Sequence, residues 1–143
     1  MMKNNASINE FIKNNLKVTH PAEEYSSMNH MLTVSRLPHI VCSDGFKMSV
    51  QVGYSLYSTP KKVAKRYSEV EIGYPSEHEP LIEKYVESIY EDPDYTDTVY
   101  PYVPVKVVDQ VLKKHGGIDI SETLGKNKSR KIWTWLSCTI TRV

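Results

Sequence analysis

Alternation of apolar and polar side chains predicts three strands in the middle of the chain. A short apolar run at residues 39–42 is followed by a turn at 43–45, and apolar residues then occupy every second position of 48–56. Residues 70–74 alternate in the same way. A period of two places successive side chains on opposite faces of a strand. The first two segments therefore predict a hairpin, and the third predicts a further strand.

Three segments have the spacing of a helix. Near the N-terminus, apolar residues between 8 and 16 predict a short helix. Ser76 and Glu79 form the Ser-x-x-Glu pattern of a capping box, and the apolar stripe at 81–90 predicts the helix that it would start. A third stripe follows Pro104 and ends at Gly116-Gly117, a typical C-terminal cap, so this is the clearest predicted helix.

Two more segments are predicted to be extended. Pro101 and Pro104 disfavour a helical conformation of the residues before them, so residues 99–103 read as a strand, and alternation predicts a last strand at 132–140. Strands and helices that are interspersed without repeated strand–helix–strand units favour an α+β fold. We expect a mainly antiparallel, twisted β-sheet with two helices packed on it, plus an N-terminal helical extension.

The polar first quarter of the chain suggests the domain organisation. Residues 1–37 are rich in Asn, Ser and charged side chains, and we interpret them as a helix and linker that pack on the main domain or on a neighbouring subunit. Residues 38–143 are expected to form one α+β ligand-binding domain. The total of 143 residues suits a single compact unit.

Charge and hydropathy exclude several partners. The 18 Lys and Arg residues nearly balance the 17 Asp and Glu residues, which leaves a formal charge of +1 and no general field for capturing DNA. No apolar run approaches the roughly 18 residues of a membrane span, and the polar start lacks the apolar stretch of a secretory signal. We therefore expect a cytoplasmic protein with neither DNA nor a membrane as a partner.

The sequence shows no arrangement typical of a catalyst. It has no GxSxG, HExxH, Walker or GxGxxG motif, and its five histidines are scattered. Cys42 and Cys138 lie in apolar, strand-like segments without a CxxC pair, so they read as buried thiols, with neither a disulfide nor a zinc site expected. We therefore favour noncovalent binding without a cofactor, a metal or a catalytic residue.

Two polar features stay open between a structural and a functional interpretation. His115 lies at the end of the helix predicted to begin near Pro104 and reads most simply as a C-terminal cap, with phosphate contact as the alternative. The acidic stretch 91–97 reads as a solvated loop, with a divalent-metal loop as the weaker alternative because it lacks a recognisable ligand spacing.

Three groups of residues suit a purine nucleotide, since aromatic rings stack on a base while cations and amides hold phosphate. Tyr100 and Tyr102 lie two apart on an extended segment and would project to one side, unless they form an ordinary surface or core pair. Arg130 and Lys131 belong to the densest basic cluster, which otherwise reads as a solvated turn. The third group is a glycine turn whose free amides would form an anion nest, or else a plain hairpin turn. Its residues are Gly45, Phe46, Lys47, Met48 and Ser49.

Four segments together resemble a family of small bacteriophage proteins. They are Asp44-Gly-Phe-Lys-Met-Ser-Val-Gln51, Val70-Glu-Ile-Gly-Tyr-Pro-Ser76, Thr98-Val-Tyr-Pro-Tyr-Val-Pro104 and Lys114-His-Gly-Gly117. The pattern is similar to the first-described type of anti-Thoeris protein, phage signal sponges that sequester the cyclic ADP-ribose isomer made by bacterial TIR-domain immune enzymes. The resemblance covers about residues 38–120.

The resemblance implies a noncatalytic binder in the cytoplasm of the infected bacterial host. It further implies a symmetric homo-oligomer, a hexamer, with ligand pockets between subunits and, in some relatives, a second site for cyclic oligonucleotides. On this chain, the turn 45–49 and the segment Tyr100-Pro101-Tyr102 match positions that it places at pockets. Arg130 and Lys131 are added from their charge alone.

Two other functions compete with sequestration. The first is inhibition of a host or defence enzyme by direct protein contact, in which the tyrosine-rich surface and the acidic loop 91–97 would form the interface. The second is an enzyme that degrades the cyclic nucleotide with an unrecognised acid–base pair, such as His115 with a carboxylate.

Overall fold

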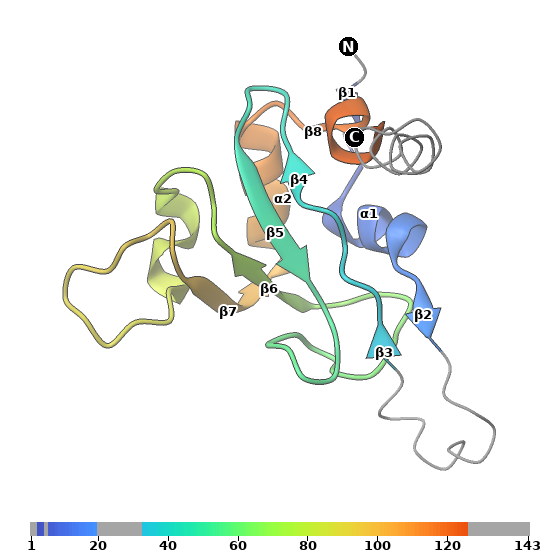
Figure 1. The fold of residues 1–143 in the computed structure, drawn as a ribbon, viewed down its shortest axis with the longest axis horizontal. Helices are drawn as coiled ribbons and strands as arrows, with labels where there is room; N and C mark the ends of the chain where they lie inside the picture. The colour runs from blue at the N-terminus through green and yellow to red at the C-terminus, as the bar shows by residue number, and fades with distance from the viewer. Residues whose placement is uncertain (1–2, 5, 20–32, 126–143) are drawn as a thin grey trace, which may run out of the picture.

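The computed structural model describes residues 3–4, 6–19 and 33–125, so the predicted strand at 132–140, Cys138, Arg130 and Lys131 lie outside the described residues. Figure 1 shows the arrangement of the elements. In chain order these are β1 (Lys3–Asn4), α1 (Ile8–Asn15), β2 (Val18–Thr19), β3 (Thr33–Val34), β4 (Ile40–Val41), β5 (Lys47–Gln51), β6 (Glu69–Gly73), the 3-10 helix η2 (Pro80–Tyr85), β7 (Val99–Pro104), α2 (Val105–Lys114), β8 (Ile118–Asp119) and the π-helical turn η3 (Ser121–Gly125).

A four-stranded antiparallel sheet in the order β4-β5-β6-β7 forms the centre of the molecule. The predicted hairpin is confirmed, with Ile40 opposite Met48, and Val50 of β5 pairs with Ile72 of β6. Two further pairs of short strands, β1 with β8 and β2 with β3, form separate two-stranded sheets. The predicted α+β class, with an antiparallel sheet and two main helices, is therefore confirmed.

One hydrophobic core joins the helices to the sheet. The predicted stripe of α2 is confirmed, since Val108, Val111 and Leu112 are buried. The apolar residues of α1 lie in the same core cluster, and the backbone amide of Ile8 donates to a carboxylate oxygen of Asp109 on α2 at 2.8 Å. Helix α1 therefore packs on the main domain, while the boundary at residue 38 stays a prediction.

The helix predicted at 81–90 is wrong in its length and its cap. Glu79, not Ser76, caps the 3-10 helix Pro80–Tyr85, and its side chain accepts from the Leu81 amide. The physical reason is Pro80, which favours an extended conformation at Glu79, while the Ser76 hydroxyl accepts from the Lys47 amide instead. Residues 86–98 form a loop that projects from the sheet at the left of Figure 1.

The strand predicted at 48–56 is also shorter than expected. It ends at Gln51, and a turn follows in which the amide of Leu56 donates to the carbonyl of Gly53 at 3.2 Å. The Ser58 hydroxyl fixes this turn by accepting from the Gly53 amide at 3.1 Å. After the turn, the chain contacts β7, where the Tyr57 carbonyl accepts from the Tyr102 amide at 3.1 Å.

Candidate ligand-binding site

Tyr57, Lys61 and Tyr102 form a compact group that we call the tyrosine–lysine cluster. The two rings lie 5.7 Å apart at a tilt of 58°. The Lys61 ammonium donates to the Tyr102 hydroxyl at 3.1 Å and to the carbonyl of Leu56 at 2.9 Å, and lies 5.3 Å from the centre of the Tyr102 ring. Because each ring is more than a third exposed, the cluster offers aromatic faces beside a positive charge.

Two carboxylates border this cluster. The amide of Tyr57 donates to Glu71 at 3.1 Å, and its hydroxyl donates to Glu87 at 3.3 Å. The negative charge of Glu87 and this hydrogen bond raise the pKa of the Tyr57 hydroxyl, which stays protonated as a donor. The cluster thus combines ring faces and one cation with acceptors for hydroxyl or amino groups.

Backbone strain marks two tyrosines of the segments on which the resemblance rests. Tyr102 has φ of 54° and Tyr74 has φ of 49°. This left-handed region is unfavourable for a bulky residue, and such outliers concentrate at functional sites. Tyr102 is held there by its amide, which donates to the carbonyl of Tyr57 at 3.1 Å.

The prediction that Tyr100 and Tyr102 project to the same side is wrong. Tyr100 is fully buried, and its hydroxyl donates to the carbonyl of Tyr95. A register shift between Val70 and Ile72 opposite β7 breaks the period of two, so the next buried residue after Tyr100 is Val103. Only Tyr102 of the predicted pair reaches the surface of a single chain.

The turn at 44–49 is a plain hairpin turn, which is the second of the two interpretations that the sequence left open, and it is not a free anion nest. Its amides are used within the chain: Gly45 donates to the carbonyl of Cys42, Phe46 to the carboxylate of Asp44, and Lys47 to the hydroxyl of Ser76. Phe46, Met48 and Ser49 are buried, whereas Gly45 and Lys47 are exposed. A ligand contact by Gly45 or Lys47 stays a prediction.

His115 caps α2 as predicted and also lies at the centre of a charged cluster that the sequence did not predict. Its Nδ1 lies 2.6 Å from Asp44 and its Nε2 lies 2.6 Å from Glu79, whose other oxygen accepts from Lys114 at 2.8 Å. The ring stacks on Phe46 with centroids 4.0 Å apart. Since both ring nitrogens contact carboxylates, neither is offered to a substrate in this arrangement.

Ionisation in this cluster follows from its contacts. Burial lowers the pKa of His115, but the hydrogen bonds to Glu79 and Asp44 outweigh burial and raise it. Burial likewise raises the pKa of Glu79, and the bonds from Lys114, the Leu81 amide and His115 outweigh it and lower the pKa. The cluster is therefore a charged link between the hairpin turn, η2 and the end of α2.

Cys42 behaves as predicted. It is a buried free thiol, and burial, with the nearby charge of Asp44, raises its pKa to about 12. A thiolate at this position is therefore disfavoured at neutral pH, which makes Cys42 a poor nucleophile.

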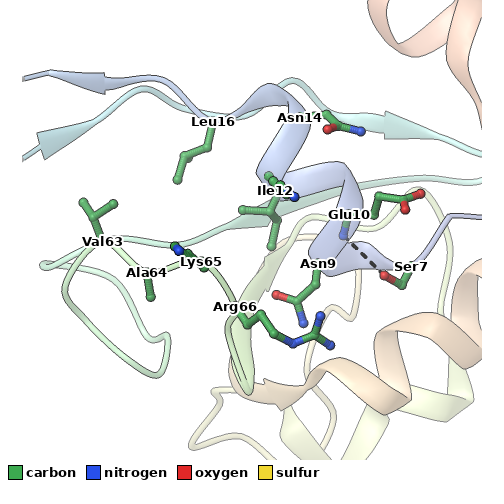
Figure 2. Close-up of a pocket in the computed structure, with 11 residues that line it drawn as sticks. Ser7, Asn9, Glu10, Ile12, Asn14, Leu16, Val63, Ala64, Lys65 and Arg66 are labelled. Atoms are coloured by element: carbon green, nitrogen blue, oxygen red, sulfur yellow. Dashed lines mark hydrogen bonds between the residues drawn. The ribbon is translucent and has the colours of Figure 1, made fainter.

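A cavity of about 810 Å³ lies between α1 and the segment 63–66. Figure 2 shows Ile12 of α1 and Leu16, the C-cap of this helix, facing Val63 and Ala64. Polar and charged residues complete the lining: Ser7, Asn9, Glu10, Lys13, Asn14, Lys65 and Arg66. This site leaves no pattern in the sequence, because it joins segments about 50 residues apart.

Two further properties concern all the residues that the structure describes: metal binding and membrane insertion. Among those that the structure describes, no group of three or more His, Cys, Asp or Glu side chains is placed to hold a metal ion. None of the described helices is long and apolar enough to cross a membrane.

In comparisons with known proteins, no protein-family model, curated protein or solved structure matches the chain significantly. The family resemblance of the four segments therefore stays a prediction.

Proposed function

We propose that this protein is a phage anti-defence protein that binds a cyclic ADP-ribose isomer, the signal of TIR-domain immune enzymes, and sequesters it without degrading it. It would act in the cytoplasm of the infected bacterium as a homo-oligomer, a hexamer in the resembling family. The observation that carries the proposal is the tyrosine–lysine cluster, with its two half-exposed rings and its anchored ammonium group.

The chemistry of this ligand class matches the cluster group by group. An adenine ring stacks on the exposed face of Tyr57 or Tyr102, a contact that contributes about 1–3 kcal/mol per base. The pyrophosphate accepts from Lys61, and charge-assisted bonds of this kind are the stronger ones. Ribose hydroxyls and the adenine amino group can donate to Glu71 and Glu87, which border the rings.

Sequestration of a signal at nanomolar concentration needs about −12 kcal/mol of binding free energy. The contacts available on one open surface fall short of this value, because water competes with each hydrogen bond. A second copy that closes over the cluster would exclude water and strengthen the charged contacts. This requirement supports the proposal of pockets between subunits.

Calorimetric titration with cyclic ADP-ribose isomers, with NAD and ADP-ribose as controls, tests the proposal. The protein is then heat-denatured and the released ligand is chromatographed. Tight binding with recovery of the intact isomer is the expected result. An altered ligand would indicate an enzyme, and the absence of any binding would overturn sequestration and favour inhibition by direct protein contact.

A further inference from the structure

The loop 86–98 exposes two large apolar side chains. Ile89 is 92% exposed and Tyr90 is 73% exposed, although large apolar groups are normally buried. The loop also carries five carboxylates and no Lys or Arg: Glu87, Glu91, Asp92, Asp94 and Asp97. An exposed apolar group surrounded by charge of one sign is typical of a contact surface.

The loop is held in place by its own hydrogen bonds. The amide of Glu87 donates to the carbonyl of Val99 at 3.0 Å, and the Thr98 hydroxyl donates to the carbonyl of Glu87 at 3.0 Å. Within the loop, the amide and hydroxyl of Thr96 both donate to Asp94. Ile89 and Tyr90 are therefore presented on a structured protrusion.

The cavity between α1 and residues 63–66 has complementary properties. Its lining contains three cations, Lys13, Lys65 and Arg66, against one carboxylate, Glu10. Within the described part of the chain, none of these three cations has an acidic partner at ion-pair distance. The cavity has a partly apolar wall, as binding pockets do, and its volume of about 810 Å³ lies in the range of such pockets.

The back of the cavity is rigid. The side-chain amide of Asn9 donates to the carbonyl of Tyr67 at 2.9 Å, and its oxygen accepts from the Tyr67 amide at 2.7 Å. This buried pair of hydrogen bonds joins α1 to the segment that carries Lys65 and Arg66.

We propose that the loop 86–98 of one copy inserts Ile89 and Tyr90 into the α1 cavity of a second copy. A single chain cannot make this contact, because the loop and α1 lie at opposite ends of the molecule (Figure 1). The carboxylates of the loop would meet Lys13, Lys65 and Arg66, which gives the contact its charge complementarity.

Because the contact joins two different surfaces, it either closes as a two-fold dimer, in which each loop enters the cavity of the other copy, or repeats head to tail as a ring or an open chain of copies. The inference deepens the proposed function by naming where copies would meet. The test of this contact uses no nucleotide. Its result would therefore still hold if the protein failed to bind the cyclic nucleotide signal.

Sedimentation velocity and light scattering on four samples of full-length chain test the contact. The loop variant carries Ile89→Ser with Tyr90→Ser, the cavity variant carries Lys65→Glu with Arg66→Glu, and Leu81→Ser with Lys106→Glu is the matched control. Leu81 and Lys106 are exposed elsewhere. We expect the wild type and the control to have at least about twice the monomer mass, and each test variant alone to be a monomer.

The equimolar mixture of the two test variants gives the sharpest result. One intact cavity and one intact loop remain, so the mixture should form a dimer with twice the monomer mass and nothing larger. A monomeric wild type, variants that keep the wild-type mass, or a mixture that stays monomeric would each overturn the proposal. A monomeric wild type whose loop binds an unrelated protein would likewise overturn it.

A cross-link keeps the proposal testable if a variant fails to fold. Tyr90→Cys and Val63→Cys, each in a separate copy, should form an intermolecular disulfide on mild oxidation, whereas Leu81→Cys with Val63→Cys should not. Equal yields for both pairs would contradict insertion of the loop.

Discussion

The imidazole Nε2 of His115 lies 2.6 Å from a carboxylate oxygen of Glu79, and both side chains are almost completely buried. The two residues are 36 positions apart, and the contact connects the end of α2 to the start of η2. Asp44 bonds to the opposite nitrogen of the ring from the hairpin turn at 2.6 Å. Three segments of the fold therefore depend on one protonated histidine, since only the imidazolium can donate from both nitrogens.

Stability should fall at both ends of the pH range. The pKa of His115 is raised above its ordinary 6.5, so its contribution is complete below pH 6.5 and is lost as pH rises through the raised value. The pKa values of Glu79 and Asp44 are lowered from 4.5 and 3.8, so their contribution is present above those values and is lost as pH falls through the lowered ones. Urea unfolding across pH should show a plateau between about pH 4.5 and 6.5.

The variant His115→Gln supplies the control for this profile. It should lose the decline on the alkaline side, because no group at this position then titrates. An alkaline decline of unchanged size in this variant would assign the decline to another group.

Substitution of Glu79 by alanine should lower the free energy of unfolding more than most single substitutions in the chain. Glu79→Ala leaves His115 and Lys114 without the carboxylate that both contact, and breaking a buried charged pair typically costs about 3–5 kcal/mol. The exposed neighbour Glu77 is the matched control, and Glu77→Ala should change the free energy of unfolding by no more than about 0.5 kcal/mol. Equal losses in the two variants, measured by urea unfolding, would show that the buried contact contributes little.

Two glycines with similar φ should respond differently to alanine. Gly45 has φ of +96° and open space at its Cβ position, so Gly45→Ala meets only the backbone strain of about 1–2 kcal/mol. Gly116 has φ of +89°, and a Cβ there would lie 3.0 Å from the Cβ of Ser43. Gly116→Ala should therefore lower the free energy of unfolding more than Gly45→Ala does. The opposite order in thermal or chemical unfolding would contradict the close approach at Ser43.

Local periodicity predicted most helices and strands of the fold, because each of them is determined by residues close together in the sequence. The hairpin, the strand at 70–74 and the helix before Gly116 follow from alternation, apolar spacing and capping. The helix expected at 81–90 was wrong because its apolar stripe continues past Tyr85, where the 3-10 helix ends. The sequence pattern did not reveal that Ile89 and Tyr90 stay exposed.

The candidate site was less predictable because its contacts are long-range. The register shift between β6 and β7 separates Tyr100 from Tyr102. It cannot be seen in the sequence, because residues 70–74 of the facing segment alternate regularly. The partners of Tyr102 come from the segment after β5, where Tyr57 follows the strand predicted at 48–56 and Lys61 belongs to no predicted site. Pairing of this kind follows from the sheet topology.

The strain at Tyr102 should be measurable as a difference between two substitutions. Both Tyr102→Ala and Tyr102→Gly remove the ring and its bond with Lys61, but only glycine adopts a φ of 54° without a steric penalty. The glycine variant should therefore be more stable than the alanine variant by about 1 kcal/mol in urea unfolding. Equal stability would mean that the backbone relaxes once the ring is absent, and the left-handed conformation would then be a consequence of the contacts of the ring.

Lys61 and Lys62 offer a matched pair for the proposed nucleotide contact. Both are exposed cations on one segment, but only Lys61 bonds to Tyr102 and lies over its ring. If Lys61 holds the pyrophosphate, Lys61→Ala removes a charge-assisted bond of about 1.5–3 kcal/mol and weakens calorimetric affinity for the cyclic nucleotide at least about tenfold. Lys62→Ala should change that affinity less than about twofold at moderate salt, because a screened charge away from the rings contributes little. Equal losses would point to general attraction by the basic segment, and the tyrosine–lysine cluster would then no longer be the site.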